Sequence, residues 1–364
     1  MNPELFVGLM SGTSLDGVDA VLADLSGARP RLIANVHAPF DDPLKRELLA
    51  LNTRGDNEIE RAALAGNNLA KRYSSAVADL LAKSKTPASM VRAIGCHGQT
   101  VRHNPAQGFT TQIGNAALLA ELTGIRVVAD FRSRDVAAGG QGAPLAPAFH
   151  AALFADAAED RAALNLGGIA NLSFLPHAGA VTGFDSGPGN CLLDLWALRH
   201  LGKPHDAEGR WAAAGAVIPA LLERLLAEPY FTAAPPKSTG RDLFNEAWLQ
   251  THLNGDENPQ AVQATLLELT ARSVADALAR HCRGARRVIA CGGGAKNSAL
   301  MRRIGELIAP VALETSDRQG IDPQLVEATA FAWLAKRALE GQSGNLASVT
   351  GARGPRVLGA IYPA

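Results

Sequence analysis

The first residues suited to chemistry lie in a glycine-rich turn between two apolar, strand-like segments near the N-terminus. The turn combines two glycines, three hydroxyls and two carboxylates, namely Gly12, Gly17, Ser11, Thr13, Ser14, Asp16 and Asp19. Glycine lets the backbone approach a ligand closely, N–H groups and hydroxyls surround an anion, and an aspartate can hold a metal ion. No Gly-Lys-Ser/Thr follows, so the turn is not a P-loop. It is either a phosphate-binding hairpin or an ordinary glycine turn between strands.

Polar residues also follow two later apolar strands. A buried strand over 91–96 leads to His97 and Gln99, and a strand over 181–185 ends at Asp185 in a turn rich in glycine. Chemistry in α/β proteins lies at strand ends, so all three side chains are candidates for a site. His97 is either such a residue or a core histidine whose hydrogen bonds are satisfied. A carboxylate such as Asp185 can act as a general base, or it can form an Asx turn or a helix N-cap.

A third glycine turn comes late in the chain, where the strand 287–291 is followed by Gly292, Gly293 and Gly294. Three glycines let the backbone lie flat against a planar ring, and the helix that follows favours a phosphate at its N-terminus. The turn lacks the Gly-x-Gly-x-x-Gly spacing of dinucleotide-binding folds.

Charged residues near these turns could contact a substrate. Arg132 and Arg134 lie in a Gly-rich, Pro-ended loop over 130–144, where an arginine either binds a carboxylate or phosphate or forms an interdomain salt bridge. The Lys-Ser-Thr-Gly-Arg loop at 237–241 lies near a ligand or is a surface turn. Glu327 lies in the first turn of a helix, where it either caps the helix or contacts a ligand.

Composition limits the function classes. The chain has 364 residues, 47% of them hydrophobic, which predicts about two domains. Its 35 basic and 35 acidic residues give no basic face for nucleic acid. No apolar run approaches the roughly 18 residues that span a bilayer, and we expect a soluble cytoplasmic protein. The scattered cysteines and histidines predict neither a zinc site nor a disulfide framework.

Strand-like and helix-like segments alternate, which predicts an α/β fold. The clearest helix is expected over 59–81, with an apolar stripe from Ile59 to Leu81, and one continuous helix is expected over 207–226. The second half begins with strand, glycine turn and strand over 163–175, then a third strand, repeating the order at the N-terminus. The sequence therefore predicts a duplicated plan.

Six motifs in order closely resemble the anhydro-N-acetylmuramic acid kinase family. They are Gly-Leu-Met-Ser-Gly-Thr-Ser-Leu-Asp-Gly-x-Asp from residue 8, Gly-x-His-Gly-Gln-Thr from 95, Asp-Phe-Arg-x-Arg-Asp-Val-Ala-Ala-Gly-Gly-Gln-Gly-Ala-Pro from 130, Gly-Phe-Asp-x-Gly-Pro-Gly-Asn from 183, Lys-Ser-Thr-Gly-Arg from 237 and Cys-Gly-Gly-Gly from 291. The resemblance implies the two-domain actin-like ATPase fold, with a ribonuclease H-like core in each domain and ATP in the interdomain cleft. We expect an N-terminal domain over 1–133, a C-terminal domain over 134–344, and a tail over 345–364 that packs on the first.

The resemblance also implies the reaction and the site. Water opens the 1,6-anhydro ring of the muramic sugar while ATP phosphorylates the released 6-oxygen, with Asp185 as the base that deprotonates the water. The implied nucleotide-binding residues are Gly12, Thr13, Ser14, Leu15, Asp16, Gly17, Val18, Asp19, Gly167, Gly168, Gly292, Gly293 and Gly294. Asp16 would face Mg²⁺, whereas Gln99, Arg134 and Glu327 would contact the amino sugar.

Two other functions are compatible with the same scaffold. One is an actin-like nucleotide switch without a sugar product, and the other is an ordinary kinase in which Asp185 deprotonates a sugar hydroxyl. Asp185 together with a substrate-facing Arg134 favours catalysis over the switch. The resemblance further implies a homodimer.

Overall fold

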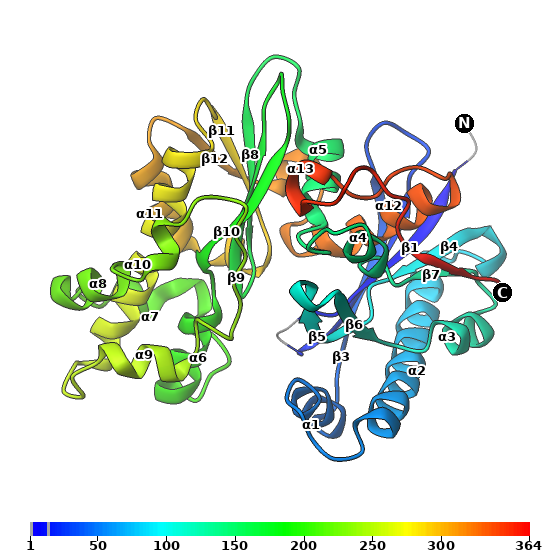
Figure 1. Ribbon diagram of the computed structural model, residues 1–364, viewed down its shortest axis with the longest axis horizontal. Coiled ribbons are helices and arrows are strands. Elements are labelled where there is room, and N and C mark those ends of the chain that lie inside the picture. The colour runs from blue at the N-terminus through cyan, green and yellow to red at the C-terminus, as the bar shows by residue number, and fades with distance from the viewer. Residues whose placement is uncertain (1–2, 13–14) are drawn as a thin grey trace. The chain divides into compact units, whose positions relative to one another are not determined.

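The computed structural model describes residues 3–12 and 15–364. The chain divides into two compact units, Met1–Leu153 with Leu325–Ala364, and Phe154–Gln324. We call them the N-terminal and C-terminal units. Each contains a mixed β-sheet with helices packed on it, so the predicted α/β class is confirmed (Figure 1).

Over the described residues, the sheet of the N-terminal unit has six strands in the order β13-β7-β4-β1-β2-β3. The first three strands form an antiparallel meander, β4 and β7 continue the sheet parallel to β1, and β13 adds antiparallel to β7. A separate hairpin is formed by β5 and β6. The strands are β1 (Leu5–Met10), β2 (Gly17–Asp24), β3 (Arg31–Pro39), β4 (Val91–Cys96), β5 (Gln99–Asn104), β6 (Phe109–Ile113), β7 (Val127–Ala129) and β13 (Ala360–Tyr362).

The sheet of the C-terminal unit has the order β10-β9-β8-β11-β12. It too begins with a three-stranded antiparallel meander and continues with two parallel strands. The two halves of the chain thus have the same strand order, which confirms the duplicated ribonuclease H-like plan. The strands are β8 (Arg161–Leu166), β9 (Ile169–Leu175), β10 (Thr182–Pro188), β11 (Arg287–Cys291) and β12 (Ala312–Thr315).

The placement of the long helices is also duplicated. In each unit, a long helix lies in the chain between the three-stranded meander and the next strand of the sheet. The helices of the N-terminal unit are α1 (Asp42–Ala50), α2 (Glu58–Ser84), α3 (Ala116–Thr123), α4 (Ser133–Ala137), α5 (Ala146–Phe154), α12 (Val326–Leu339) and α13 (Ala347–Thr350). Those of the C-terminal unit are α6 (Cys191–Leu201), α7 (Arg210–Ala213), α8 (Pro219–Leu226), α9 (Glu246–His252), α10 (Pro259–His281) and α11 (Ser298–Ile308).

Alternation along β1 builds a core on each face of the N-terminal sheet. Val7 and Leu9 pack with α2, whereas Phe6 packs with Phe331 and other residues of α12. The contact with α12 is close because β1 and β4 present glycines to it. A Cβ added at Gly8 would lie 1.9 Å from the carbonyl oxygen of Ala328, and one added at Gly95 would lie 2.0 Å from that of Phe331. Only glycine allows this helix to lie directly on the strands.

The units do not have the expected bounds of 1–133 and 134–344. Helix α12 belongs to the N-terminal unit because it packs on β1 and β4. The loop after β7 belongs there as well, because the fully buried carboxylate of Asp135 accepts hydrogen bonds from Asn345 Nδ2 (2.6 Å), Thr350 Oγ1 (2.8 Å) and Gly142 N (2.8 Å). The boundaries fall at 153/154 and 324/325 because these contacts join distant segments of the chain.

Two expectations about helices are wrong in detail. The segment 207–226 is not one helix, because Gly209 has a left-handed φ of +70° and Pro219 starts a new helix, α8. Helix α2 covers the expected segment, but Ile59 at its start is 90% exposed, so the core-facing stripe begins at Ala65. Helical periodicity identified α2 but could not show where its buried face begins.

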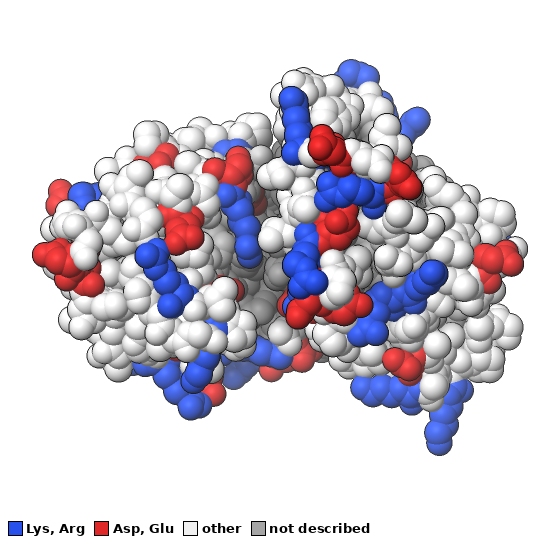
Figure 2. All heavy atoms as spheres, turned by 90° about the horizontal axis from the view of Figure 1, so that it is seen from below, with Lys and Arg blue, Asp and Glu red and all other residues white. Residues whose placement is uncertain are grey.

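Charged side chains of both signs are mixed over the face of the molecule that Figure 2 shows, as expected from equal numbers of basic and acidic residues. Among the described residues, no helix has the length and apolarity that a bilayer crossing requires.

The contact between β4 and α12 makes a prediction about stability. Gly95→Ala should lower the free energy of unfolding by about 1–3 kcal/mol, because the added methyl group overlaps the backbone of α12. Gly27→Ala is the matched control, since its added Cβ would come no nearer than 3.6 Å to another atom, and it should change stability by less than about 0.5 kcal/mol. Denaturant unfolding measures both, and equal effects would contradict the packing argument.

Candidate functional site

Three glycine turns come together at one end of the C-terminal sheet. They are the β8–β9 turn, the turn around residues 189–190 and the turn after β11. The β8–β9 turn contains Gly167 and Gly168, whose carbonyl oxygens accept hydrogen bonds from the N–H groups of Asn190 (2.8 Å) and Gly189 (2.9 Å). The Asn190 side chain also donates to Leu166 O at 3.0 Å. The turn after β11, residues 292–294, packs on the same group. Sequence reasoning predicted these turns separately, and the fold joins them.

Glycine is required in this cluster where an added Cβ would overlap a neighbouring backbone or side-chain atom. A Cβ at Gly189 would lie 2.3 Å from Gly167 O, and one at Gly294 would lie 2.7 Å from Leu166 Cβ. Gly292 has φ +82°, and its Cβ would lie 2.4 Å from Asn165 Oδ1. Gly293 differs, because nothing lies within 4 Å of its added Cβ. The chain's own packing therefore does not require a glycine at 293, although a ligand lying against this turn would.

Asp185 lies in the middle of β10, which continues to Pro188 instead of ending at Asp185 as expected, and its pairing with β9 is irregular just after it. Asp185 is held by the 237–241 loop. Its Oδ2 accepts a hydrogen bond from Thr239 N at 3.0 Å, and its backbone N–H donates to Lys237 O at 3.2 Å. Tyr230 Oη donates to Asp185 O at 2.8 Å, and the Lys237 ammonium lies 4.6 Å from the Tyr230 ring centre. The Lys-Ser-Thr-Gly-Arg motif thus supports the carboxylate rather than forming an independent surface turn.

Burial raises the pKa of Asp185 to about 6, against the lowering effects of the Thr239 N–H and the Lys237 cation. The same burial lowers the pKa of Lys237. A carboxyl with a pKa close to neutral can exchange a proton near physiological pH, which suits a general base.

A row of paired residues connects Asp185 to the β11 turn. Cys291 pairs with Asn165, Asn165 with Asn171, and Asn171 with Asp185 across four neighbouring strands. Paired residues project from the same face of a sheet. The candidate base and the turn that follows Cys291 therefore lie at the same end of the C-terminal sheet.

The β1–β2 hairpin carries most of the other predicted nucleotide-binding residues. Leu15 and Val18 are buried, so their side chains belong to the core. Gly17 lies against β3, with its added Cβ 2.5 Å from Ala38 O, and Asp19 Oδ1 pairs with His37 Nδ1 at 2.9 Å. Thr13 and Ser14 lie outside the described residues. Of the described part of the turn, Gly12 and Asp16 remain the candidates for direct ligand contact.

Asp16 is exposed at the start of β2. Within the described part of the chain, no group of three or more His, Cys, Asp or Glu residues is arranged to hold a metal ion. Mg²⁺ in phosphoryl-transfer sites is typically bound by one or two carboxylates, water and the phosphates themselves. A single exposed aspartate beside a glycine turn fits that kind of site.

Gln99 and His97 lie at the β4–β5 turn, where both are buried. Gln99 Nε2 donates to Gly12 O at 3.3 Å, which connects this turn to the N-terminal hairpin. His97 Nε2 accepts from Arg132 Nε at 3.1 Å. Burial, reinforced by the Arg132 cation, lowers the pKa of His97 to about 3, so its ring is neutral.

Arg132 is the more enclosed of the two loop arginines. Its Nη1 donates to Gly142 O at 2.7 Å, and burial lowers its pKa to about 10 although Glu327 and Asp135 act in the opposite direction. Arg134, the arginine that we expected to contact the substrate, is exposed on α4. Residue type alone could not distinguish the two arginines, because the difference arises from the fold of the loop. Arg132 precedes α4 and is half-buried, whereas Arg134 lies on the helix and is exposed.

Four residues near these sites were not predicted to have a role, namely Asn171, Tyr230, Thr239 and Asn190. Tyr230 lies 45 residues along the chain from Asp185, to which it donates. Asn171 lies in the hairpin 163–175, where the sequence showed a strand and no motif at that residue. Thr239 and Asn190 belong to motifs identified in the sequence, which was the available signal.

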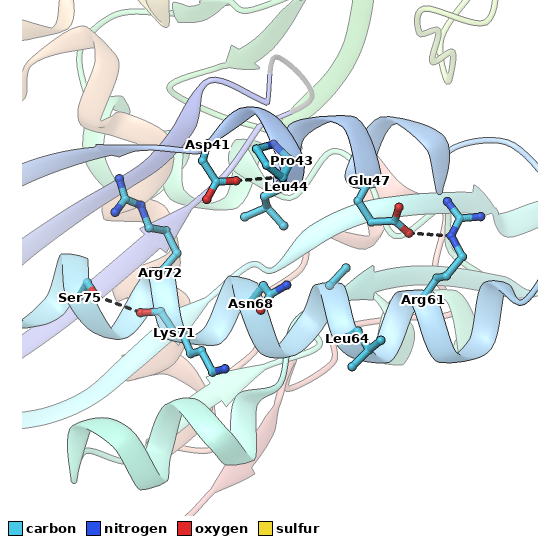
Figure 3. Close-up of a pocket in the computed structure, with 11 residues that line it drawn as sticks. Asp41, Pro43, Leu44, Glu47, Arg61, Leu64, Asn68, Lys71, Arg72 and Ser75 are labelled. Carbon is cyan, nitrogen blue, oxygen red and sulfur yellow. Dashed lines mark hydrogen bonds and ion pairs between the residues drawn. The ribbon is translucent and has the colours of Figure 1, made fainter.

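A cavity of about 620 Å³ lies between α1 and α2 (Figure 3). Several of its polar residues have structural partners: Asp41 caps α1 through Leu44 N (2.8 Å), and Glu47 pairs with Arg61 (2.7 Å). Arg72 binds Pro39 O. None of the predicted site residues lines this cavity, so we assign it no function.

The duplicated sheets, with a glycine-rich hairpin in each, define a two-domain protein of the actin-like ATPase class, to which sugar kinases belong. The chain matches the family described as anhydro-N-acetylmuramic acid kinase over residues 4–364. It belongs to the anhydro-N-acetylmuramic acid kinase family and is an enzyme of the kinase class.

Curated relatives with that name are similar over their whole length. One from Variovorax paradoxus is 58% identical over 100% of both chains, and one from Nitrosospira multiformis is 53% identical over 100% of both. Among solved structures, a ROK family glucokinase from Streptomyces griseus in complex with glucose and AMPPNP is 14% identical with a TM-score of 0.42, covering 92% of this chain and 99% of that one. Because that similarity is low, the fold assignment depends on strand order and family membership.

The open space at Gly293 gives a prediction about nucleotide binding. Gly293→Ala should leave the free energy of unfolding within about 0.5 kcal/mol of the parent, because the methyl group meets no protein atom. If adenosine lies on this turn, the same substitution should weaken ATP binding at least about tenfold, or about 1.4 kcal/mol. Calorimetric titration with ATP measures the affinity.

Gly292→Ala provides the comparison, because it should destabilise the unit by its strained φ and its overlap with Asn165. Unchanged ATP affinity in a stable Gly293→Ala variant would exclude this turn from the nucleotide site.

Proposed function

We propose that this enzyme opens 1,6-anhydro-N-acetylmuramic acid with water and phosphorylates its released 6-oxygen, giving N-acetylmuramic acid 6-phosphate in murein recycling. Family membership supports a sugar kinase of cell-wall recycling that acts on an amino sugar. The observation that carries the finer proposal is Asp185, a carboxylate with a pKa of about 6 at the edge of a glycine-rich site.

Asp185 acts as the general base in this proposal. Water is a poor nucleophile at neutral pH, so removal of its proton can accelerate attack by about 10²–10⁴-fold. The water oxygen bonds to the anomeric carbon, the bond from that carbon to the 6-oxygen breaks, and the 6-oxygen takes the γ-phosphoryl group of ATP. The proton passes to Asp185, and ADP is the second product, so atoms and charges balance.

The nucleotide roles follow the glycine turns. We assign the adenosine to residues 292–294, with Gly167 and Gly168 beside them, and the phosphates to the hairpin 12–19. Asp16 would hold Mg²⁺, which supplies charge neutralisation to the phosphates when it is bound. The described side chains fit these roles by exposure at Asp16 and by close backbone approach at the glycines.

The sugar contacts are assigned to Gln99, Arg134 and Glu327. Gln99 supports its assignment with a buried Oε1 that has no hydrogen-bond partner among the described residues. Arg134 is exposed and can pair with the lactyl carboxylate, for which guanidinium is well suited. Glu327 lies in the first turn of α12, close enough to the Arg132 guanidinium to raise the pKa of that arginine.

Two further assignments rest on the family resemblance and on the substrates. We propose a homodimer, which light scattering can check. We also assign the enzyme to the cytoplasm, because ATP is a cytoplasmic substrate.

The role of Asp185 is tested by Asp185→Asn. The variant keeps the shape of the side chain but cannot take a proton, so turnover should fall by at least about 100-fold while ATP affinity stays within twofold. Asp242→Asn, an exposed aspartate next to the same loop, is the matched control and should keep near-parent turnover. If the Asp185→Asn variant kept more than about a tenth of the parent turnover rate, the base would be another group.

The source of the new oxygen separates ring opening from ordinary phosphorylation of a hydroxyl. In ¹⁸O-labelled water, ring opening places the label on the anomeric carbon at the rate of product formation. Label that enters no faster than spontaneous exchange would contradict the proposed reaction and support a simple sugar kinase.

The pKa of Asp185 predicts the pH dependence. Because the ionised carboxylate is the active form, kcat/KM for the sugar should rise with pH and level off above about 6. Lys237→Met removes a cation that lowers this pKa, so its acidic limb should move to higher pH. Lys203→Met, at an exposed site, should leave the profile unchanged. A limb that does not respond to Lys237 would contradict the assignment of that pKa to Asp185.

A further inference from the structure

The residue that pairs with Asp185 across the sheet is Asn171. The next pair along the same two strands, Leu172 and Phe184, is buried in the core of the C-terminal unit. Because successive residues of a strand point to opposite faces, Asn171 and Asp185 project together from the other face. Side chains paired in this way have Cβ atoms about 4.5–5.5 Å apart, which is close enough for one water molecule to contact both.

Both side chains have an acceptor that the protein leaves open. Asn171 Oδ1 is buried and has no hydrogen-bond partner among the described residues. Asp185 Oδ2 accepts from Thr239 N, while no hydrogen bond within the described part of the chain reaches Oδ1. Thr239 Oγ1, on the loop that holds Asp185, is also buried and has no hydrogen-bond partner within the part of the chain that the structure describes. Buried polar atoms without partners are rare in native proteins, so a ligand is expected here.

The two open acceptors match the two hydrogens of a water molecule. We propose that Asn171 is a second catalytic residue, which accepts one hydrogen of the attacking water while Asp185 takes the other. With both hydrogens held, a lone pair of the water oxygen is directed away from the two side chains and toward the anomeric carbon. This inference rests on the proposed function and adds to it the group that orients the nucleophile.

The chemistry of the step is unchanged by this addition. One O–H bond of water breaks as its proton passes to Asp185, and the oxygen bonds to the anomeric carbon. The second hydrogen stays on the oxygen and keeps its hydrogen bond to Asn171 Oδ1. The site therefore favours a nucleophile with two hydrogens over one with a single hydrogen.

Methanol distinguishes the two kinds of nucleophile, because it has one hydroxyl hydrogen and would leave Asn171 Oδ1 unpaired. The experiment incubates the enzyme with ATP and the anhydro-sugar in aqueous methanol and measures the ratio of methyl glycoside to free sugar 6-phosphate. The parent enzyme should form little methyl glycoside. Asn171→Ala should raise that ratio at least about fivefold and lower kcat by about 10–100-fold, with ATP affinity within twofold.

The matched control is Asn165→Ala, which alters the neighbouring asparagine in the same row but not the partner of Asp185. It should leave the product ratio unchanged. Thermal unfolding checks that each variant is folded, and Asn171→Leu, which keeps the side-chain volume, replaces the alanine variant if that one unfolds. Asn171 variants with the parent ratio and with kcat within twofold of the parent would overturn the proposal.

Failure of this proposal can be told apart from failure of the proposed function. If ¹⁸O from water reaches the anomeric carbon in the parent enzyme but Asn171 has no effect on the ratio, ring opening stands and Asn171 has no role in it. If no label is incorporated, the proposed reaction fails, and the role of Asn171 fails with it.

Discussion

Close packing at glycine positions, where an added Cβ would overlap a neighbouring atom, is the constraint on which the rest of this structure depends. In the N-terminal unit, Gly8 and Gly95 let α12 lie on β1 and β4 without any intervening side chain. In the C-terminal unit, glycines at 189, 292 and 294 let three turns share one small region. A methyl group at most of these positions would overlap a carbonyl or a side chain within 3 Å, so the elements would have to separate. The glycines thus set the distances between elements as well as the shapes of turns.

These contacts also position charged groups that lie beside them. Ala328 lies against Gly8, and Glu327 is the preceding residue, so the packing of α12 brings this carboxylate near the half-buried Arg132. Arg132 in turn donates to His97, which the same burial keeps neutral. The hydrogen bonds of this half-buried cation and the nearby carboxylate offset part of its desolvation, which still lowers its pKa to about 10.

In the C-terminal unit, burial has a different effect on a carboxylate. Asp185 has one backbone N–H and one distant cation as compensation, and its pKa therefore rises instead of falling. Aspartates with several hydrogen-bond donors behave in the opposite way: Asp24 accepts from two backbone N–H groups and from Arg31, and its pKa falls to about 2 although burial acts against this. The number of donors that the fold supplies decides whether the pKa of a buried carboxyl is lowered or raised.

The sequence by itself determined the α/β class, the duplicated strand order, most element positions and the motif that contains Asp185. These depend on local patterns: apolar runs, helical periodicity, and glycine turns at strand ends. Only the tertiary structure decided the unit boundaries, because Asp135 bonds to residues 345 and 350 and α12 returns to the first sheet. It also decided that Arg132 is enclosed and Arg134 exposed, and that Asn171 lies opposite Asp185. Such choices depend on contacts between residues far apart in the chain, which local sequence patterns do not record.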